Sequence, residues 1–171
     1  MSTLQYNCTK FIFNTVTEEM PGERFKEQFN IRWTSYRKWF LSDRSDYRPS
    51  YLESLRALKE FMPELIPTYE NIVELVGGGD LQARFLSHYC PPAYISGCSQ
   101  AVWQGKEPLL VRNYDYAPEL CDGVILHSRW NGQWVMGMTD GLFGLLDGIN
   151  ESGLAISLTF GGRRVVGKGF G

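Results

Sequence analysis

In the segment YISGCSQAVW (Tyr94–Trp103), Gly97 stands directly before Cys98 at the start of a strand-like run. A cysteine in a strand is commonly a small hydrophobic residue, and a glycine before it commonly ends a turn. The same pair suits a nucleophile at a point where the backbone must be free to bend. The surrounding sequence has to decide between these two interpretations.

Length and composition describe an ordinary globular chain. The 171 residues suffice for one domain with a real core, and 43% are hydrophobic against 21% charged. The formal net charge is −2, with basic and acidic residues mixed along the chain, so no basic block indicates a nucleic-acid partner. The aromatic share of 14% favours a large core or a substrate pocket.

The sequence contains no targeting or membrane signal that we recognise. No stretch approaches ~20 uninterrupted apolar residues, and the start lacks a basic segment followed by an apolar one. The cysteines have no paired spacing, and with only two histidines neither a metal site nor a cofactor is expected. A reducing cytoplasm is therefore the predicted compartment. The four cysteines are Cys8, Cys90, Cys98 and Cys121.

The first half of the chain is predicted to be mostly helical. A strand is expected over Leu4–Thr15, and a helix starts near Pro21 with aromatic residues at spacings of three and four. A second helix is expected from about Ser50 to Phe61, and a third follows Pro63 and Pro67. The expected core positions are Phe25, Phe29, Trp33, Tyr36 and Phe40 in the first helix, Leu52, Leu55 and Leu58 in the second, and Ile72, Val73 and Leu75 in the third.

The run VGGGD (Val76–Asp80) has the glycines of a phosphate-binding loop, but it follows a helix and lacks the lysine and the serine or threonine of a P-loop. A glycine that ends one helix and an Asp80 that caps the next explain it better.

The second half is predicted to be antiparallel sheet. The pair Asn131-Gly132 favours a tight type I′ hairpin, and Gly105-Lys106 is expected to close another. The predicted fold class is therefore α+β, with Cys98 at the junction between helices and sheet. The predicted strands cover residues 93–104, 107–114, 123–130, 133–139 and 153–160.

Arg112 and Asp115 are the charged residues placed to act on Cys98. If the hairpin is centred at Gly105, Cys98 lies directly opposite Arg112, with the two Cβ atoms ~5 Å apart. A guanidinium at that distance would stabilise a thiolate, the reactive form of cysteine. Asp115 lies just past the strand end, close enough to bond Arg112 or an amine beside Cys98. A slip of one residue would spoil this geometry.

Three stretches in order, GCSQ (97–100), LLVRNYDY (109–116) and LDGINESGLAISLTFGG (146–162), carry a family resemblance. They resemble the acyl-coenzyme A:6-aminopenicillanic acid acyltransferases and, more distantly, the choloylglycine hydrolases, which are N-terminal-nucleophile (Ntn) hydrolases. The resemblance implies an αββα sandwich in which residues 1–97 form a precursor segment and residues 98–171 begin the nucleophile-bearing segment. It implies a zymogen that cuts itself between Gly97 and Cys98.

The resemblance also assigns the site. Cys98 would attack an amide or acyl-thioester carbonyl, its own α-amino group would act as base, Arg112 would stand near the thiol, and Asp115 would hold the new amine. Thr159 corresponds most nearly to a further oxyanion or substrate contact. Too little chain follows Cys98 for two sheets and their covering helices. We therefore expect an incomplete fold whose remainder is a C-terminal part of the same protein, absent here or present as a separate chain. By itself this part is expected to be inactive or severely impaired as an enzyme. The expected partner is a small-molecule amide or acyl-CoA-like substrate, and association with further copies of this chain is left open. Neither a nucleic acid nor a membrane is expected as a partner.

Two other interpretations remain open. Cys98 and His127 could form a papain-like pair, although such nucleophiles usually begin a helix and SQAVWQ is strand-like. Alternatively, the chain could be a non-catalytic domain that binds a ligand or partner, with Cys98 in its core.

Overall fold

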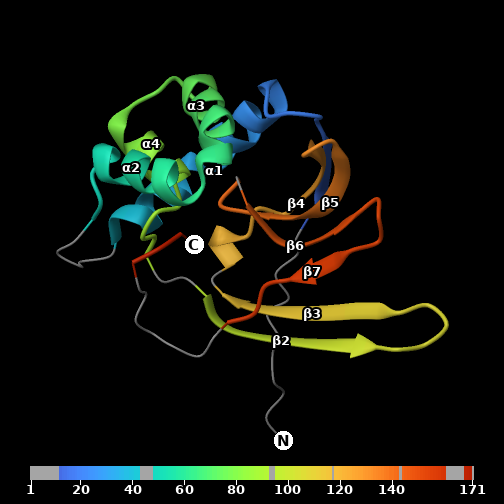
Figure 1. The fold of residues 1–171 in the computed structure, drawn as a ribbon. Coiled ribbons are helices and arrows are strands. Elements are labelled where there is room, and N and C mark those ends of the chain that lie inside the picture. Colours follow the sequence, from blue (N-terminus) through green and yellow to red (C-terminus); the bar gives the residue numbers. More distant parts are fainter. Residues whose placement is uncertain are drawn as a thin grey trace, which may run out of the picture.

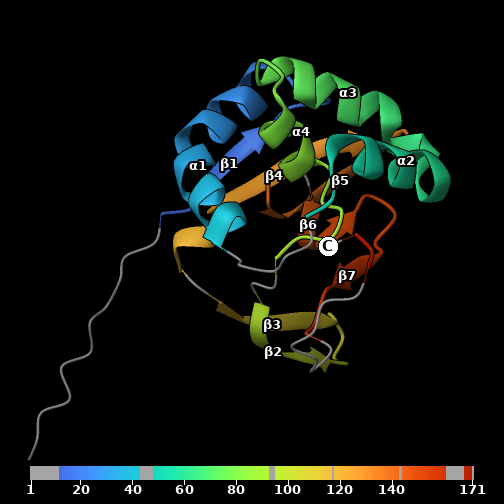
Figure 2. The ribbon, with the colours of Figure 1, turned by 90° about the vertical axis from the view of Figure 1, so that its left-hand side faces the viewer.

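The computed structural model describes residues 12–42, 48–92, 95–116, 118–142, 144–160 and 168–170. Its elements form layers: four α-helices cover one side of a five-stranded sheet, and a two-stranded hairpin lies on the other side, next to β6 and β7 (Figures 1 and 2). The fold class is α+β, as predicted.

The helices follow the predicted order. α1 (Glu23–Ser42) buries Phe25, Phe29, Tyr36 and Phe40, so the aromatic face predicted from its spacing is confirmed. α2 (Tyr51–Phe61) is followed by the 3-10 turn η1 (Pro63–Leu65) and by α3 (Ile66–Leu75). α4 (Asp80–Leu86) supplies Phe85, which packs against the rings of Phe29, Trp33, Tyr36, Trp39 and Phe40.

Two details of the helices differ from prediction. Leu52 is 67% exposed, and the small residue Ser54, at 1%, occupies the buried face of α2 instead. α2 begins at a capping box in which the Ser50 hydroxyl accepts from the Glu53 N–H and the Glu53 carboxylate accepts from the Ser50 N–H. Asp80 does not cap α4 as predicted: Gly79, with φ of 106°, is the N-cap, and Asp80 is the first helical residue.

The five-stranded sheet has the order β1-β4-β5-β6-β7, with β1 parallel to β4 and the other pairs antiparallel. Asn131 and Gly132 have φ of 50° and 81°, which confirms the type I′ turn. β6 was not predicted. Of the strand expected over Leu4–Thr15, residues 1–11 lie outside the described part of the chain, and within the described part the strand β1 covers Asn14–Thr17. The bounds are β1 (Asn14–Thr17), β4 (Val124–Trp130), β5 (Gln133–Asp140), β6 (Gly144–Asn150) and β7 (Ala155–Ser157).

The hairpin that carries Cys98 consists of β2 (Ile95–Trp103) and β3 (Leu109–Tyr116). Its register shifts between Ile95 and Gly97, which inserts one extra residue in β2 directly before Gly97. After β3, the 3-10 turn η2 (Pro118–Leu120) leads through Asp122 into β4. Along the chain the hairpin therefore lies between the helices and the strands β4–β7 of the large sheet.

Candidate functional site

Cys98 and Arg112 lie on the same face of the β2–β3 hairpin and touch. The Arg112 Nη2 donates to Cys98 Sγ at 3.5 Å. The predicted direct opposition is wrong by two residues, because Cys98 pairs with Tyr114 and Arg112 pairs with Gln100. A shift of two keeps both side chains on one face, so Arg112 reaches the thiol diagonally.

Arg112 is held by groups from three strands. Its Nη1 donates to the Leu146 carbonyl oxygen in β6 at 2.7 Å and to Ser157 Oγ in β7 at 3.2 Å. Its guanidinium carbon lies 3.5 Å from the centroid of the Tyr114 ring. The Ser157 hydroxyl in turn donates to Gln100 Oε1 at 2.9 Å. The cation beside the thiol is thus fixed by the contact between the hairpin and the large sheet.

Tyr114 is tied to the large sheet at its hydroxyl, which donates to Asp147 Oδ2 at 3.1 Å. Burial, and then the charge of Asp147, raise the pKa of Tyr114 above its ordinary value, while the Arg112 charge acts in the opposite direction. The phenol therefore stays protonated at neutral pH and remains a donor. Sequence reasoning did not identify Tyr114, Asp147 or Ser157, although the strand alternation places Tyr114 on the Arg112 face.

Asp115 lies on the opposite face of the hairpin from Cys98 and pairs with Gly97. A Cβ built on Gly97 would lie 3.3 Å from Asp115 Oδ2. The carboxylate also accepts from Asn113 Nδ2 at 2.7 Å. Asp115 therefore stands beside the backbone at Gly97, next to the Gly97–Cys98 peptide bond, and not between Arg112 and the thiol.

The other predicted residues lie apart from this cluster. Thr159 is exposed beyond the end of β7, and no hydrogen bond joins it to Cys98 or Arg112 in the described part of the chain. His127, in β4, stacks on the Trp134 ring at 4.4 Å. Within the described residues no hydrogen bond links His127 with Cys98, and Cys98 lies in a strand, so the structure gives the papain-like pair no support.

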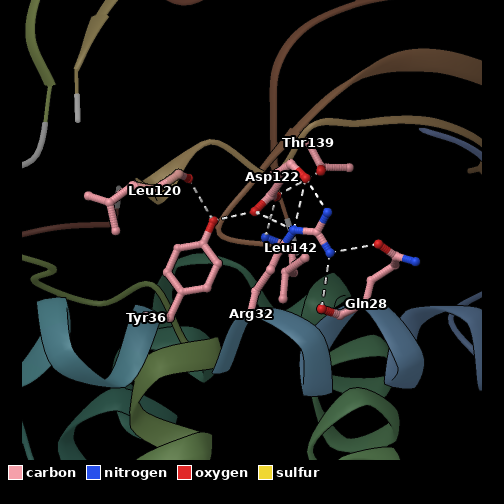
Figure 3. Close-up of polar contacts among 7 residues, drawn as sticks. All are labelled: Gln28, Arg32, Tyr36, Leu120, Asp122, Thr139 and Leu142. Atoms are coloured by element: carbon pink, nitrogen blue, oxygen red, sulfur yellow. Dashed lines mark hydrogen bonds and ion pairs between the residues drawn. The ribbon is translucent and has the colours of Figure 1, made fainter. Parts of the chain in front are cut away.

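A second polar cluster joins α1 to the sheet around Asp122, which is 1% exposed (Figure 3). Its carboxylate accepts from the Tyr36 hydroxyl, from the Thr139 hydroxyl at 2.7 Å and from the Leu142 N–H at 3.0 Å, and it lies 3.9 Å from Arg32 Nε. Burial raises the pKa of Asp122, while these donors and the Arg32 charge act to lower it. Every carboxylate oxygen is bonded, so this cluster serves to hold α1 on the sheet.

A small cavity of about 20 Å³ lies beside this cluster, between α1, α4 and the β5–β6 turn. It is lined mainly by aromatic side chains together with His88 and Asp140, and it has room for about one water. Burial lowers the pKa of His88 to about 4, so its imidazole is neutral at pH 7. The cavity is too small for a substrate.

The described residues offer no metal centre and no membrane span. No group of three or more His, Cys, Asp or Glu side chains among them could hold a metal ion. None of the helices in the described part is long and apolar enough to cross a bilayer. Cys90, Cys98 and Cys121 are free thiols.

An α+β fold that holds a thiol against a fixed guanidinium suits acyl-transfer chemistry, in which a nucleophile attacks a carbonyl. Residues 102–171 match the family of acyl-coenzyme A:6-aminopenicillanic acid acyl-transferases. The resemblance predicted from the sequence is confirmed over this segment, and an acyltransferase or hydrolase of the Ntn type is indicated at the level of the family. The matched segment includes Arg112, Asp115 and Thr159 and begins after Cys98. Comparisons with curated proteins and with solved structures found no match.

Proposed function

We propose that this chain is a self-processing cysteine Ntn hydrolase or acyltransferase that acts on a linear amide or an acyl thioester. Cys98 is its nucleophile and becomes the N-terminal residue when the bond after Gly97 is cut. The observation that supports this proposal is the 3.5 Å contact between Arg112 Nη2 and Cys98 Sγ, in a strand whose bulge directly precedes Gly97.

Self-cleavage starts with attack of the Cys98 sulfur on the Gly97 carbonyl carbon. The C–S bond forms as the C–N bond breaks, the thiol proton passes to the departing amine, and residues 1–97 are left as a thioester. Water then hydrolyses the thioester, which gives a carboxylate on Gly97 and a free thiol and α-amine on Cys98. Gly97 permits the backbone conformation for this attack, and the bulge turns the peptide out of the regular ladder.

Turnover repeats the same chemistry on a substrate. The α-amine of Cys98, a group that titrates near ~8 in model peptides, takes the thiol proton and delivers it to the leaving amine or thiol. Arg112 stabilises the thiolate, and Asp115, beside Gly97, accepts a hydrogen bond from the α-amine. Water or an acyl acceptor then releases the acyl group from sulfur. We retain Thr159 as a proposed substrate contact at the end of β7.

The proposal includes no cofactor and assigns the activity to the cytoplasm. We propose that the division at Gly97 separates a helical precursor segment, residues 1–97, from a nucleophile segment that begins at Cys98. The αββα sandwich implied by the resemblance remains part of this proposal. Support comes from the helices, the large sheet and the hairpin, which already lie in three successive layers (Figure 2).

Intact-mass analysis of the purified protein tests the proposal. We expect two fragments that break between Gly97 and Cys98 and together equal the full chain plus one water. Cys98→Ala should abolish the break, whereas Cys121→Ala and His127→Ala should leave it unchanged. Cleavage that persists in Cys98→Ala contradicts the proposal. So does turnover of acyl p-nitroanilides or acyl thioesters that survives this substitution.

A further inference from the structure

We propose that Tyr114 is a positioning residue for the catalytic arginine: its ring, tethered through its hydroxyl to Asp147, is the platform that keeps Arg112 against Cys98. This inference rests on the proposed function, because it assigns Tyr114 a part in activating the same nucleophile. It concerns a residue that contacts the arginine rather than the substrate.

The register of the hairpin places the ring where a platform is required. Tyr114 is the direct cross-strand partner of Cys98, and Arg112 lies two residues before it on the same face. Directly opposed residues have Cβ atoms ~5 Å apart, and diagonal neighbours ~7–8 Å. The Arg112 side chain has to cross between residues 114 and 100 to reach the sulfur, and it does so on the Tyr114 side, with its guanidinium carbon 3.5 Å from the ring centroid.

The ring itself cannot move freely, because the Tyr114 hydroxyl donates to Asp147 Oδ2 at 3.1 Å. Asp147 is in turn fixed in β6, where its Oδ1 accepts from the Met138 N–H of β5 at 3.3 Å. The platform is therefore tied to the middle of the large sheet and not only to the hairpin.

The bonds of Arg112 show why a platform matters. Both hydrogen bonds to the large sheet use Nη1, which fixes one corner of the guanidinium and leaves its plane free to tilt about that corner. The Nε–H is buried and has no acceptor among the residues that the structure describes, and a buried unpaired donor favours any rearrangement that finds one. The ring blocks one side of the plane and attracts the cation, so Nη2 stays directed at Cys98 Sγ.

The test measures alkylation of Cys98 by iodoacetamide in the full-length protein, with peptide mass spectrometry to report each cysteine separately. Because the thiolate is the reactive form, a displaced guanidinium slows this reaction. Cation–π contacts are worth about 1 kcal/mol, so Tyr114→Leu should slow alkylation of Cys98 by about five-fold. Tyr114→Phe keeps the ring but loses its tether to Asp147, so its alkylation rate should lie between that of Tyr114→Leu and that of the unmodified protein. Labelling of Cys90 and Cys121 in the same sample reports whether the fold is intact.

A double-mutant cycle separates positioning from a general structural effect. Arg112→Met removes the guanidinium and keeps much of the stem, so adding Tyr114→Leu to it should cause no further slowing. Val111→Ala, at a position 61% exposed on the other face of β3, is the matched control and should leave the rate unchanged. An equal slowing by Tyr114→Leu with and without Arg112 overturns the inference, as does no slowing at all.

Failure of this inference can be told apart from failure of the proposed function. The alkylation cycle requires neither self-cleavage nor a substrate. Independent effects of Tyr114 and Arg112, together with cleavage that depends on Cys98, refute the platform and leave the function standing. Coupled effects of Tyr114 and Arg112, together with cleavage that persists in Cys98→Ala, support the platform and refute the proposed function.

Discussion

Replacing Asp122 by alanine should destabilise the protein more than any exposed charge substitution. The carboxylate links α1, which lies before the proposed cut, to β5 and the β5–β6 turn, which lie after it (Figure 3). Alanine removes the acceptor from the Thr139 hydroxyl and the Leu142 N–H, both in buried surroundings. The Tyr36 hydroxyl keeps the Leu120 carbonyl oxygen at 3.1 Å, and Arg32 keeps the carbonyl oxygen of residue 122.

The magnitude follows from these orphaned groups. Each buried donor left without an acceptor costs about 1–3 kcal/mol, and removing the buried carboxylate returns part of that because its desolvation is no longer required. We therefore expect Asp122→Ala to lower the free energy of unfolding by about 2–5 kcal/mol. For a chain of this length, each kcal/mol corresponds to about 2–4 °C in Tm.

Urea unfolding followed by tryptophan fluorescence measures the change. Tyr36→Phe should cost about 1 kcal/mol because it removes one hydroxyl, while the Asp122 carboxylate still accepts from the Thr139 hydroxyl and the Leu142 N–H. Lys26→Ala breaks an exposed pair with Glu23 at 4.0 Å and should cost between 0 and about 1 kcal/mol. If Asp122→Ala unfolds at the same urea concentration as Lys26→Ala with an unchanged slope, the argument that this cluster holds α1 on the sheet is refuted.

Four further predictions test other parts of the structure. If the chain is cut after Gly97, the two fragments should co-elute in size-exclusion chromatography, because α1 and β1 stay bound to the sheet, and Asp122→Ala should make them separate at lower urea. Gly141→Ala should destabilise the fold by about 1–3 kcal/mol, since φ is +58° and the new Cβ would lie 2.3 Å from His88 Cε1; thermal unfolding measures it. Because burial lowers the pKa of His88 to about 4, the unfolded chain binds a proton that the folded chain does not, so stability falls as pH drops from about 6.5 to 4; His88→Gln should flatten that dependence in urea titrations. Ser50→Ala should cost about 1 kcal/mol by removing the cap of α2, visible as a lower urea midpoint.

Sequence patterns predicted the elements that local rules determine, such as a helix with one buried face. The aromatic spacing of α1 and the Asn131-Gly132 turn each follow from local rules, and both are confirmed. The sequence did not predict β6, because Gly144, Asp147 and Gly148 interrupt the alternation of apolar residues that is typical of a strand. In the sheet Gly148 faces Gly137, where a Cβ would lie 2.1 Å from the Asp147 carbonyl oxygen, so the small residues there serve close strand contact and not a turn.

The site was only partly predictable, because its geometry depends on the exact strand register and on contacts between distant parts of the chain. The hairpin is centred on Lys106 instead of Gly105, because Trp103 pairs with Leu109 across a five-residue loop. This difference shifts the cross-strand partner of each hairpin residue by two positions. Because the shift is even, the same side chains still lie on the same face of the hairpin. The contacts of Arg112 with Leu146 and Ser157 join residues far apart in sequence, and no local pattern encodes how the hairpin rests on β6 and β7.

The diagonal register suits the chemistry better than direct opposition would. A long arginine directly opposite Cys98, with Cβ atoms ~5 Å apart, would have to fold back to bring its guanidinium to the sulfur. At the diagonal distance of ~7–8 Å the side chain extends naturally, and the opposed position is left for a rigid ring. Tyr114 fills it, with its hydroxyl bonded to Asp147 and its face under the cation. The shift of two residues that the sequence did not predict is therefore what places Tyr114, the strand partner of Cys98, under the guanidinium that reaches the thiol.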